Sequence, residues 1–215
     1  MNIAEKTRKI ILKPLEPKHV VAATHCISTT FTKGEPMSEA LAISEEEFSY
    51  FAQLFIQKAA IDQLSVVAVT DTDEVVGALI CEDYASPPPT GLEHVSEKFG
   101  PIAGLLETLG ERFAQLHNVI PGSHLHMFMC GIYPQYARQQ FAQRLISFAE
   151  DIARERGYKA TVCEATGAVS QHMVKNSLGY TYVDEIIYQD FQYEEQAVFS
   201  TINTVKSCVA YYKAL

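Results

Sequence analysis

Residues 132–142 read Ile-Tyr-Pro-Gln-Tyr-Ala-Arg-Gln-Gln-Phe-Ala and connect a predicted strand to a predicted helix. The strand, residues 124–132, shows a strict alternation of side chains. This alternation places four of them on one face of the strand: His124, His126, Phe128 and Cys130. The helix, residues 139–156, carries apolar side chains on one face and is followed by Gly157, a typical C-terminal stop. The stretch is therefore a loop between a strand and an amphipathic helix.

The rest of the chain repeats the alternation of strands and helices on both sides of this loop. Upstream, the pattern predicts a strand at 9–14, a helix at 18–31, a helix capped by Ser44 and Glu47, a hairpin at 65–81 and a helix at 99–117. Downstream, it predicts a strand at 159–165, a helix at 170–176, a strand at 180–191 and a last strand at 207–212 on the sheet edge. This order predicts one α/β domain over residues 1–215 around a mixed sheet, with a helical insertion at about 85–122 between two strands.

The composition is that of a globular protein with an acidic surface. The 215 residues are 47% hydrophobic and 20% charged, and the formal net charge is −9. Such a surface repels phosphate backbones, so we expect no nucleic-acid partner, whereas a cationic small molecule is attracted.

The cysteines and the N-terminus predict a reducing, cytoplasmic location. The five cysteines are widely spaced and include neither a CxxC pair nor metal-ligand spacing, so we expect free thiols and no metal. Charged residues occupy the N-terminus, where a signal peptide needs an apolar stretch. No apolar run approaches membrane-spanning length, so we expect no membrane partner.

The loop at 132–142 resembles the acetyl-CoA loop of GCN5-related N-acetyltransferases (GNAT), whose usual form is Pro-x-Tyr-Arg-Gly-x-Gly-x-Gly/Ala. Pro134, Tyr136 and Ala142 fit this form, whereas Ala137 replaces the first family position and Gln140 replaces a family glycine. In the family, free N–H groups at the helix start bind the pyrophosphate of CoA, helped by the helix dipole. The resemblance implies a twisted mixed sheet flanked by helices, with acetyl-CoA bound where two strands separate. It assigns cofactor binding to Ile132, Tyr133, Arg138, Gln139, Gln140, Phe141, Ala142 and Ser170.

Three further segments extend the resemblance over nearly the whole chain. Residues 177–180, Ser-Leu-Gly-Tyr, resemble the Lys-Leu-Gly-Phe signature of the family. Residues 31–37, Phe-Thr-Lys-Gly-Glu-Pro-Met, resemble the Phe-x-Lys-x-Glu-Pro-Leu stretch of insect arylalkylamine N-acetyltransferases. The tail at 188–199 resembles the Tyr-x-Asp-Tyr…Val-Phe ending of the same subfamily. The implied reaction is acetyl transfer from acetyl-CoA to a small, arylalkylamine-like primary amine.

The same resemblance suggests catalytic roles for Glu35, His126 and Ser170. Glu35 matches the glutamate that takes the amine proton, and the alternative is a turn residue on a solvated loop. His126 overlays one histidine of a His-x-His pair, where a neutral imidazole relays the proton; the alternative is a histidine near the wet end of a strand. Ser170 matches a serine near the CoA sulfur that protonates the leaving thiolate, or it is an N-cap residue. Three tyrosines are other candidates for this proton: Tyr133, Tyr182 and Tyr188.

Two alternatives to an arylalkylamine acetyltransferase remain open. One is an enzyme of the same fold with a polyamine, an amino acid or a protein N-terminus as acceptor. The other is an acyl-CoA-binding module without turnover, suggested by Ala137 and Gln140. The sequence is compatible with a monomer or a homodimer.

Overall fold

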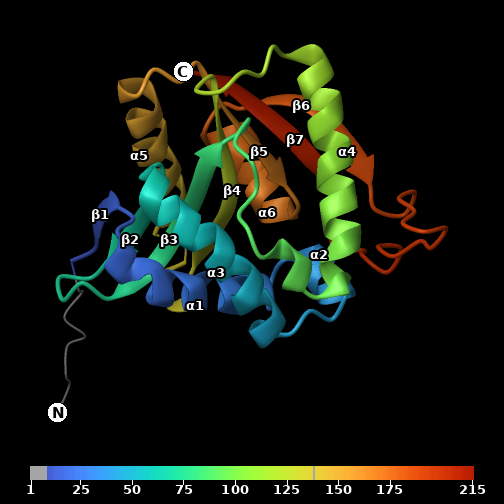
Figure 1. The fold of residues 1–215 in the computed structure, drawn as a ribbon, viewed down its shortest axis with the longest axis horizontal. Helices are drawn as coiled ribbons and strands as arrows, with labels where there is room; N and C mark the ends of the chain where they lie inside the picture. The colour runs from blue at the N-terminus through green and yellow to red at the C-terminus, as the bar shows by residue number, and fades with distance from the viewer. Residues whose placement is uncertain (1–8, 138) are drawn as a thin grey trace.

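The computed structural model describes residues 9–137 and 139–215, and within them the strands form one mixed sheet (Figure 1). Seven strands follow each other across this sheet in the order β1-β2-β3-β4-β5-β7-β6. Their bounds are β1 Ile11–Pro14, β2 Val66–Val69, β3 Val75–Asp83, β4 His124–Ile132, β5 Ala160–Ala165, β6 Thr181–Ile187 and β7 Ser207–Ala214. Only β4 and β5 are parallel neighbours; every other neighbouring pair is antiparallel. The α/β fold class expected from the sequence is confirmed.

Helices cover both faces of this sheet (Figure 1). Their bounds are α1 Val20–Phe31, α2 Pro36–Ala40, α3 Glu45–Asp62, α4 Gly100–Leu116, α5 Phe141–Glu155 and α6 Ala168–His172. Consecutive side chains of β2 point to opposite faces of the sheet, so they pack into two different cores, one on each face. Val66 packs in the core that contains α5, whereas Val67 packs in the core that contains α1 and α3.

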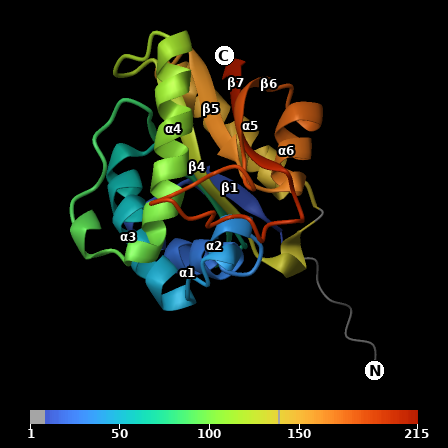
Figure 2. The ribbon, with the colours of Figure 1, turned by 90° about the vertical axis from the view of Figure 1, so that its right-hand side faces the viewer.

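A third core joins α4 to the strands at the far end of the sheet. It contains Leu105 and Leu109 of α4 together with Ile186 of β6 and Cys208 of β7. The segment between β6 and β7 folds back over α2 and the first turns of α4 (Figure 2). A Cβ atom placed on Gly100 would lie 2.7 Å from the hydroxyl of Tyr193 in this segment. A larger residue at the start of α4 would therefore have to displace the Tyr193 side chain.

Local sequence signals explain where several elements begin. Ser44 and Glu47 form the expected capping box, in which each side chain accepts from the other residue's backbone N–H, so α3 begins at Glu45. Pro36 occupies the first turn of α2, where its missing N–H costs no hydrogen bond. Between β3 and β4, two short 3₁₀ turns, Leu92–His94 and Glu97–Phe99, precede α4.

Two expectations about the strands are wrong. The last strand, β7, lies between β5 and β6 rather than on the edge, because its extended backbone pairs with both neighbours. The strict alternation of β4 is broken at Phe128: Cys81 pairs with Met127 and Ile80 pairs with Met129, which leaves Phe128 as the extra residue of a bulge. As a result Cys130 packs with the α5 core, on the opposite side from Met129.

Candidate active site

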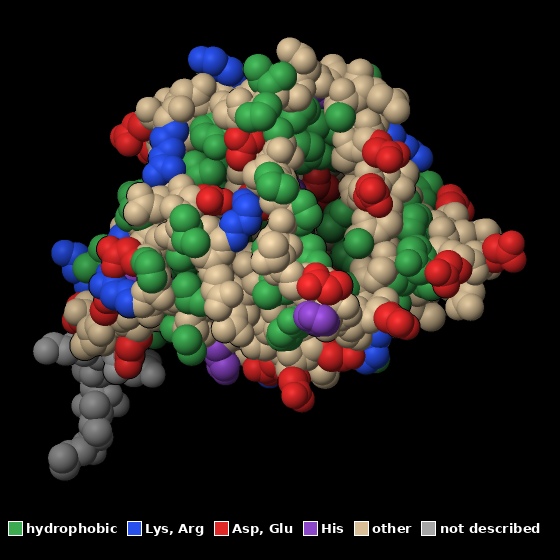
Figure 3. All heavy atoms as spheres, in the orientation of Figure 1, with side chains coloured by type: hydrophobic (Ala, Val, Ile, Leu, Met, Phe, Trp, Pro, Cys, Tyr) green, Lys and Arg blue, Asp and Glu red, His purple; other side chains and the backbone are tan. Residues whose placement is uncertain are grey.

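A large cavity opens on the face of the molecule between α3 and α4 (Figure 3). Its volume is about 1820 Å³; hydrophobic side chains form much of its lining, and acidic side chains lie both inside it and near its mouth. The lining includes five of the residues that the sequence proposed for the site: Glu35, Ile132, His126, Ala142 and Ser170. Residues that are distant in sequence therefore line one cavity.

The cavity reaches the place where β4 and β5 separate. These two strands pair at three positions, from His124 opposite Ala160 to His126 opposite Val162, and their pairing ends there. From Met127 to Ile132, β4 continues with β3 as its only paired neighbour in the described sheet. This leaves one edge of β4 with backbone N–H and C=O groups free to pair with an extended ligand.

Glu35 lies at the start of α2 with its carboxylate in the cavity lining. The side chain is 8% exposed and accepts hydrogen bonds from the backbone N–H of Met37 (3.1 Å) and of Ser38 (2.7 Å). The Ser38 hydroxyl donates a third bond, 2.6 Å long, to the same carboxylate oxygen as the Ser38 N–H. These donors fix the direction of the carboxylate, so Glu35 is the N-cap of α2 and not a solvated turn residue.

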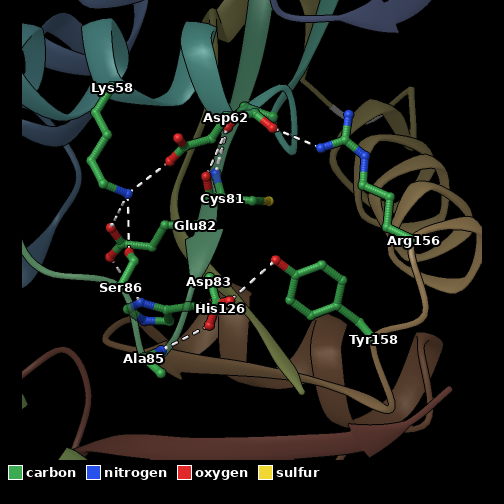
Figure 4. Close-up of polar contacts among 11 residues, drawn as sticks. Lys58, Asp62, Cys81, Glu82, Asp83, Ala85, Ser86, His126, Arg156 and Tyr158 are labelled. Atoms are coloured by element: carbon green, nitrogen blue, oxygen red, sulfur yellow. Dashed lines mark hydrogen bonds and ion pairs between the residues drawn. The ribbon is translucent and has the colours of Figure 1, made fainter. Parts of the chain in front are cut away.

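His126 is held between two carboxylates from neighbouring strands. Its Nε2 lies 2.7 Å from Oε2 of Glu164 on β5, and its Nδ1 lies 3.3 Å from Oε1 of Glu82 on β3. Figure 4 shows Glu82 between His126 and Lys58 of α3, whose Nζ is 3.7 Å from the other Glu82 oxygen. Lys58 also binds Asp62 at 2.7 Å. Acidic and basic side chains thus alternate along a row that begins at Asp62 and ends at Glu164. Its members are Asp62, Lys58, Glu82, His126 and Glu164.

This environment keeps a proton on His126. Burial on its own would lower the pKa of His126, but the adjacent Glu164 carboxylate, with Glu82, raises that pKa to about 10. The ring is therefore an imidazolium at neutral pH and cannot accept a further proton. The neutral imidazole expected from the sequence is wrong for this reason. His124, two residues earlier, lies outside the cavity lining and packs against Phe113 and Tyr212.

The start of α5 has the features of an anion site. Gln140 precedes α5 with φ 59°, a left-handed conformation that favours glycine, and its side chain makes no capping bond. The N–H groups of the first turn, from Phe141 onward, thus lack the usual cap. Gln139 is exposed beside them, and the Tyr133 N–H is already bound to the Val76 carbonyl. Arg138 lies outside the described residues.

Residues 35–180 match the model of the acetyltransferase (GNAT) family. This match spans more than half of the chain, from the Glu35 carboxylate to the end of the CoA-type loop and beyond. The chain belongs to the GNAT family. It is accordingly an acyl-CoA-dependent N-acyltransferase. A comparison with curated proteins finds no match.

Solved structures of similar fold include insect arylalkylamine N-acetyltransferases. Arylalkylamine N-acetyltransferase 2 from Aedes aegypti is 20% identical, with a TM-score of 0.80 over 96% of this chain and 99% of that chain. The C-terminal condensation domain of Ebony, in complex with beta-alanyl-dopamine, is 16% identical, with a TM-score of 0.85 over 97% and 100%. A polyamine N-acetyltransferase of Drosophila melanogaster is 19% identical, with a TM-score of 0.72 over 96% and 100%. At these identities the likeness shows the fold.

Ser170 and Tyr188 each donate a hydrogen bond to a backbone carbonyl of the segment that follows β5 in this GNAT domain. The Ser170 hydroxyl donates to the Gly167 carbonyl at 2.9 Å, inside α6 rather than at its N-cap, which is Gly167. Tyr188 is fully buried and donates to the Thr166 carbonyl at 2.8 Å, and burial raises the pKa of its hydroxyl. Tyr182, in contrast, is 49% exposed and lies outside the cavity lining.

Sequence reasoning missed two groups of cavity residues. The first is the pair Glu82 and Glu164. Each is a carboxylate directly after a cysteine in a mostly apolar strand, and that contrast was the available signal. The second is an aromatic wall of four phenylalanines: Phe51, Phe55, Phe99 and Phe128. Phe51 stacks on Phe99 at 4.4 Å between centroids, and Phe55 lies 4.7 Å from Phe128. The capping box at Ser44 and Glu47 predicted the helix that carries Phe51 and Phe55, but not that one of its faces lines a cavity.

No helix among the described residues combines the length and the apolar character needed to cross a bilayer. Within the same residues, no group of three or more His, Cys, Asp or Glu side chains is placed to hold a metal ion.

Proposed function

We propose that this GNAT chain transfers an acetyl group from acetyl-CoA to the primary amine of a small, arylalkylamine-like molecule. The observation that carries the proposal is the buried Glu35 carboxylate, fixed by three donors in the wall of a cavity where β4 and β5 separate. In the same proposal the whole chain acts as one GNAT domain, with residues 85–122 as an insertion that carries α4 to the cavity mouth.

Two backbone features support acetyl-CoA as the donor. The unpaired edge of β4 between Met127 and Ile132 offers N–H and C=O groups to the amide groups of pantetheine. The uncapped first turn of α5, from Phe141 and Ala142 onward, offers N–H groups and the positive end of the helix dipole to the pyrophosphate. In the sequence, Arg138 and Gln139 come just before Gln140 and this turn. The residues present therefore fit the co-substrate, and a backbone N–H near Ile132 polarises the thioester carbonyl.

Glu35 acts in this proposal as the general base. An amine is mostly an ammonium ion at neutral pH, and it must lose a proton before its nitrogen can attack the thioester carbon. The carbon–sulfur bond then breaks, and the thiolate takes up a proton as the amide forms. Glu35 receives the ammonium proton, directly or through water, and Ser170 lies in the same cavity as a candidate donor to the sulfur.

The aromatic wall supports an acceptor with an apolar body. Phe51, Phe55 and Phe128 surround one side of the cavity, and ring stacking and apolar burial both favour an aromatic or long alkyl group there. The net charge of −9 favours a cationic amine over an acidic acceptor. Polyamines, amino acids and protein N-termini remain second candidates because the cavity volume admits more than one acceptor shape.

Thiol release from acetyl-CoA tests the proposal when it is measured with a panel of amines and the product mass is identified. We expect release that depends on a primary arylalkylamine, with the amine gaining one acetyl group. The left-handed Gln140 at the CoA loop favours a second candidate, a binding module without turnover. Stabilisation of the chain by acetyl-CoA, without thiol release for any amine, would support that second candidate instead.

A further inference from the structure

Tyr193 lies in the segment between β6 and β7, residues 188–206, and its half-buried side chain belongs to the cavity lining. Figure 2 shows this segment beside α2 and the first turns of α4. One core contains Met37 of α2, Leu105 of α4 and Phe199 of the segment. The segment that carries Tyr193 therefore packs against the helix that is capped by the proposed base, Glu35.

The backbone of α4 comes close to the Tyr193 ring at two glycines. A Cβ atom on Gly100 would lie 2.7 Å from the Tyr193 hydroxyl, and one on Gly104 would lie 3.3 Å from two ring carbons. The ring thus lies along one turn of α4. Gly104 lies inside the helix, where glycine is less favourable than alanine, so this close approach has a cost in helix stability.

The turn that follows Tyr193 is built from two residues in unfavourable backbone conformations. Glu194 has φ 48° and Glu195 has φ 63°, both in the left-handed region that favours glycine. The backbones of Tyr193 and Gln196 close the turn with two hydrogen bonds, 3.0 and 2.9 Å long. Strained backbone persists only where its surroundings fix it, and it is common at binding sites. Tyr193 therefore projects from a turn whose backbone is fixed.

The Tyr193 ring limits the room beside the chain of an arylalkylamine. In the proposed function the aromatic wall receives the acceptor ring on the α3 side of the cavity, and Glu35 receives the amine at the start of α2. The chain between ring and amine then passes beside α2, α4 and the segment that carries Tyr193. A second ring on this chain would need the space that Tyr193 occupies, and close-packed side chains resist such added volume.

We propose that Tyr193 is a specificity-determining residue that admits unbranched arylalkylamines and excludes acceptors with a second bulky group on the chain. This inference rests on the proposed function, because it takes the reacting amine to lie at Glu35. Exclusion depends on the volume of the ring and not on the hydroxyl, which lies against Gly100. The acceptor class is therefore narrower than the cavity volume alone allows.

Two matched amines test this inference: 2-phenylethylamine and 2,2-diphenylethylamine, which carries one additional phenyl group on the chain. The wild-type kcat/KM should favour 2-phenylethylamine by roughly tenfold or more. Tyr193→Ala removes a ring of about the size of the added phenyl group, so this preference should fall by roughly tenfold or more. Equal kcat/KM for the two amines in the wild-type protein would overturn the inference, as would an undiminished preference in Tyr193→Ala.

Two further variants serve as controls. Tyr193→Phe keeps the ring and removes only the hydroxyl, so it should keep the wild-type preference; loss of the preference here would contradict exclusion by ring volume. Tyr182→Ala removes an exposed tyrosine that lies outside the cavity lining, and the preference should again be retained. A preference that falls equally in Tyr182→Ala and Tyr193→Ala would contradict a specific role for Tyr193.

Binding and turnover together separate this inference from the proposed function. Calorimetry with CoA present gives the dissociation constants of both amines. If 2-phenylethylamine is acetylated and Tyr193→Ala leaves the preference unchanged, only the inference fails. If neither amine is acetylated, but the wild-type protein binds 2-phenylethylamine more tightly and Tyr193→Ala removes that difference, the proposed function fails and the role of Tyr193 stands. Absence of binding by both amines would overturn both.

Discussion

The Glu35 side chain caps α2 and also lines the cavity, so a substitution there affects two properties at once. The N-cap contribution is typically about 1 kcal/mol, and a glutamine can retain part of it through its amide oxygen. The change Glu35→Gln therefore separates the chemistry from the fold better than Glu35→Ala does. It removes the base while most of the hydrogen bonds to Met37 and Ser38 can remain.

We predict that Glu35→Gln lowers kcat/KM by roughly 10²–10⁴ while acetyl-CoA binding is retained. The loss should shrink as the pH approaches the pKa of the amine, where free amine no longer needs a base. Steady-state kinetics between pH 6 and pH 9 measure this, with kcat and KM determined separately because the lost charge also affects binding of a cation. Glu39→Gln is the control, since Glu39 is an exposed acid of the same helix. Wild-type kinetics for Glu35→Gln would leave Glu35 with its capping role only.

His126 gives a second prediction at the scale of one residue. Its pKa rises from 6.5 to about 10 on folding, so between these values the folded state binds more protons and stability falls as the pH rises. The groups that face the ring are Glu82, Glu164 and Tyr84. Its stabilising effect is complete below pH 6.5 and is lost as the pH rises through about 10.

The variant His126→Gln measures this effect. At neutral pH it should lower the free energy of unfolding by about 3–5 kcal/mol, because it leaves the buried Glu164 carboxylate without its cation and Glu82 with Lys58 alone. Urea unfolding of both proteins at pH 6.5, 8 and 10 should show this difference shrinking toward pH 10. A difference that stays constant over that range would mean that His126 is neutral in the folded protein.

The loop before α5 gives a prediction at the scale of an element. Gln140 has φ 59° and precedes the helix, so a glycine there removes the cost of a left-handed residue, about 1–2 kcal/mol, without losing helix propensity. We predict that Gln140→Gly leaves the affinity for CoA unchanged or increases it, and does not lower the melting temperature. Gln139→Gly is the control, since Gln139 has no such conformation. A collapse of CoA affinity in calorimetry would show that the Gln140 side chain makes its own contact.

Helices and strands with strong local sequence signals were predictable from sequence. Features that depend on which strands pair with each other were not. The bounds of β4, His124–Ile132, agree with the sequence prediction because a run of alternating residues is flanked by breakers. The capping box at Ser44 and Glu47 fixed the start of α3 in the same way. The position of β7 inside the sheet and the bulge at Phe128 depend on which strands pair, which no local pattern records.

At the scale of the molecule, the sequence predicted the fold and part of the candidate site. Family-type motifs placed Glu35, Ser170 and Ala142, and the structure brings them to one cavity. The partners of His126 were not predictable, because Glu82 and Glu164 lie 44 and 38 residues away and meet it only through sheet pairing. The protonated state of His126 follows from those partners, so reasoning from the His-x-His pattern gave the wrong charge.

The central claim is that the separation of β4 and β5 binds acetyl-CoA, and thermal unfolding tests it most directly. Binding to the folded state alone stabilises by about 2.7 kcal/mol at a hundredfold excess over Kd. For a chain of this length that corresponds to a rise in Tm of roughly 5–10 °C. We predict that Tm rises progressively with acetyl-CoA concentration. An unchanged Tm at millimolar acetyl-CoA would contradict the account.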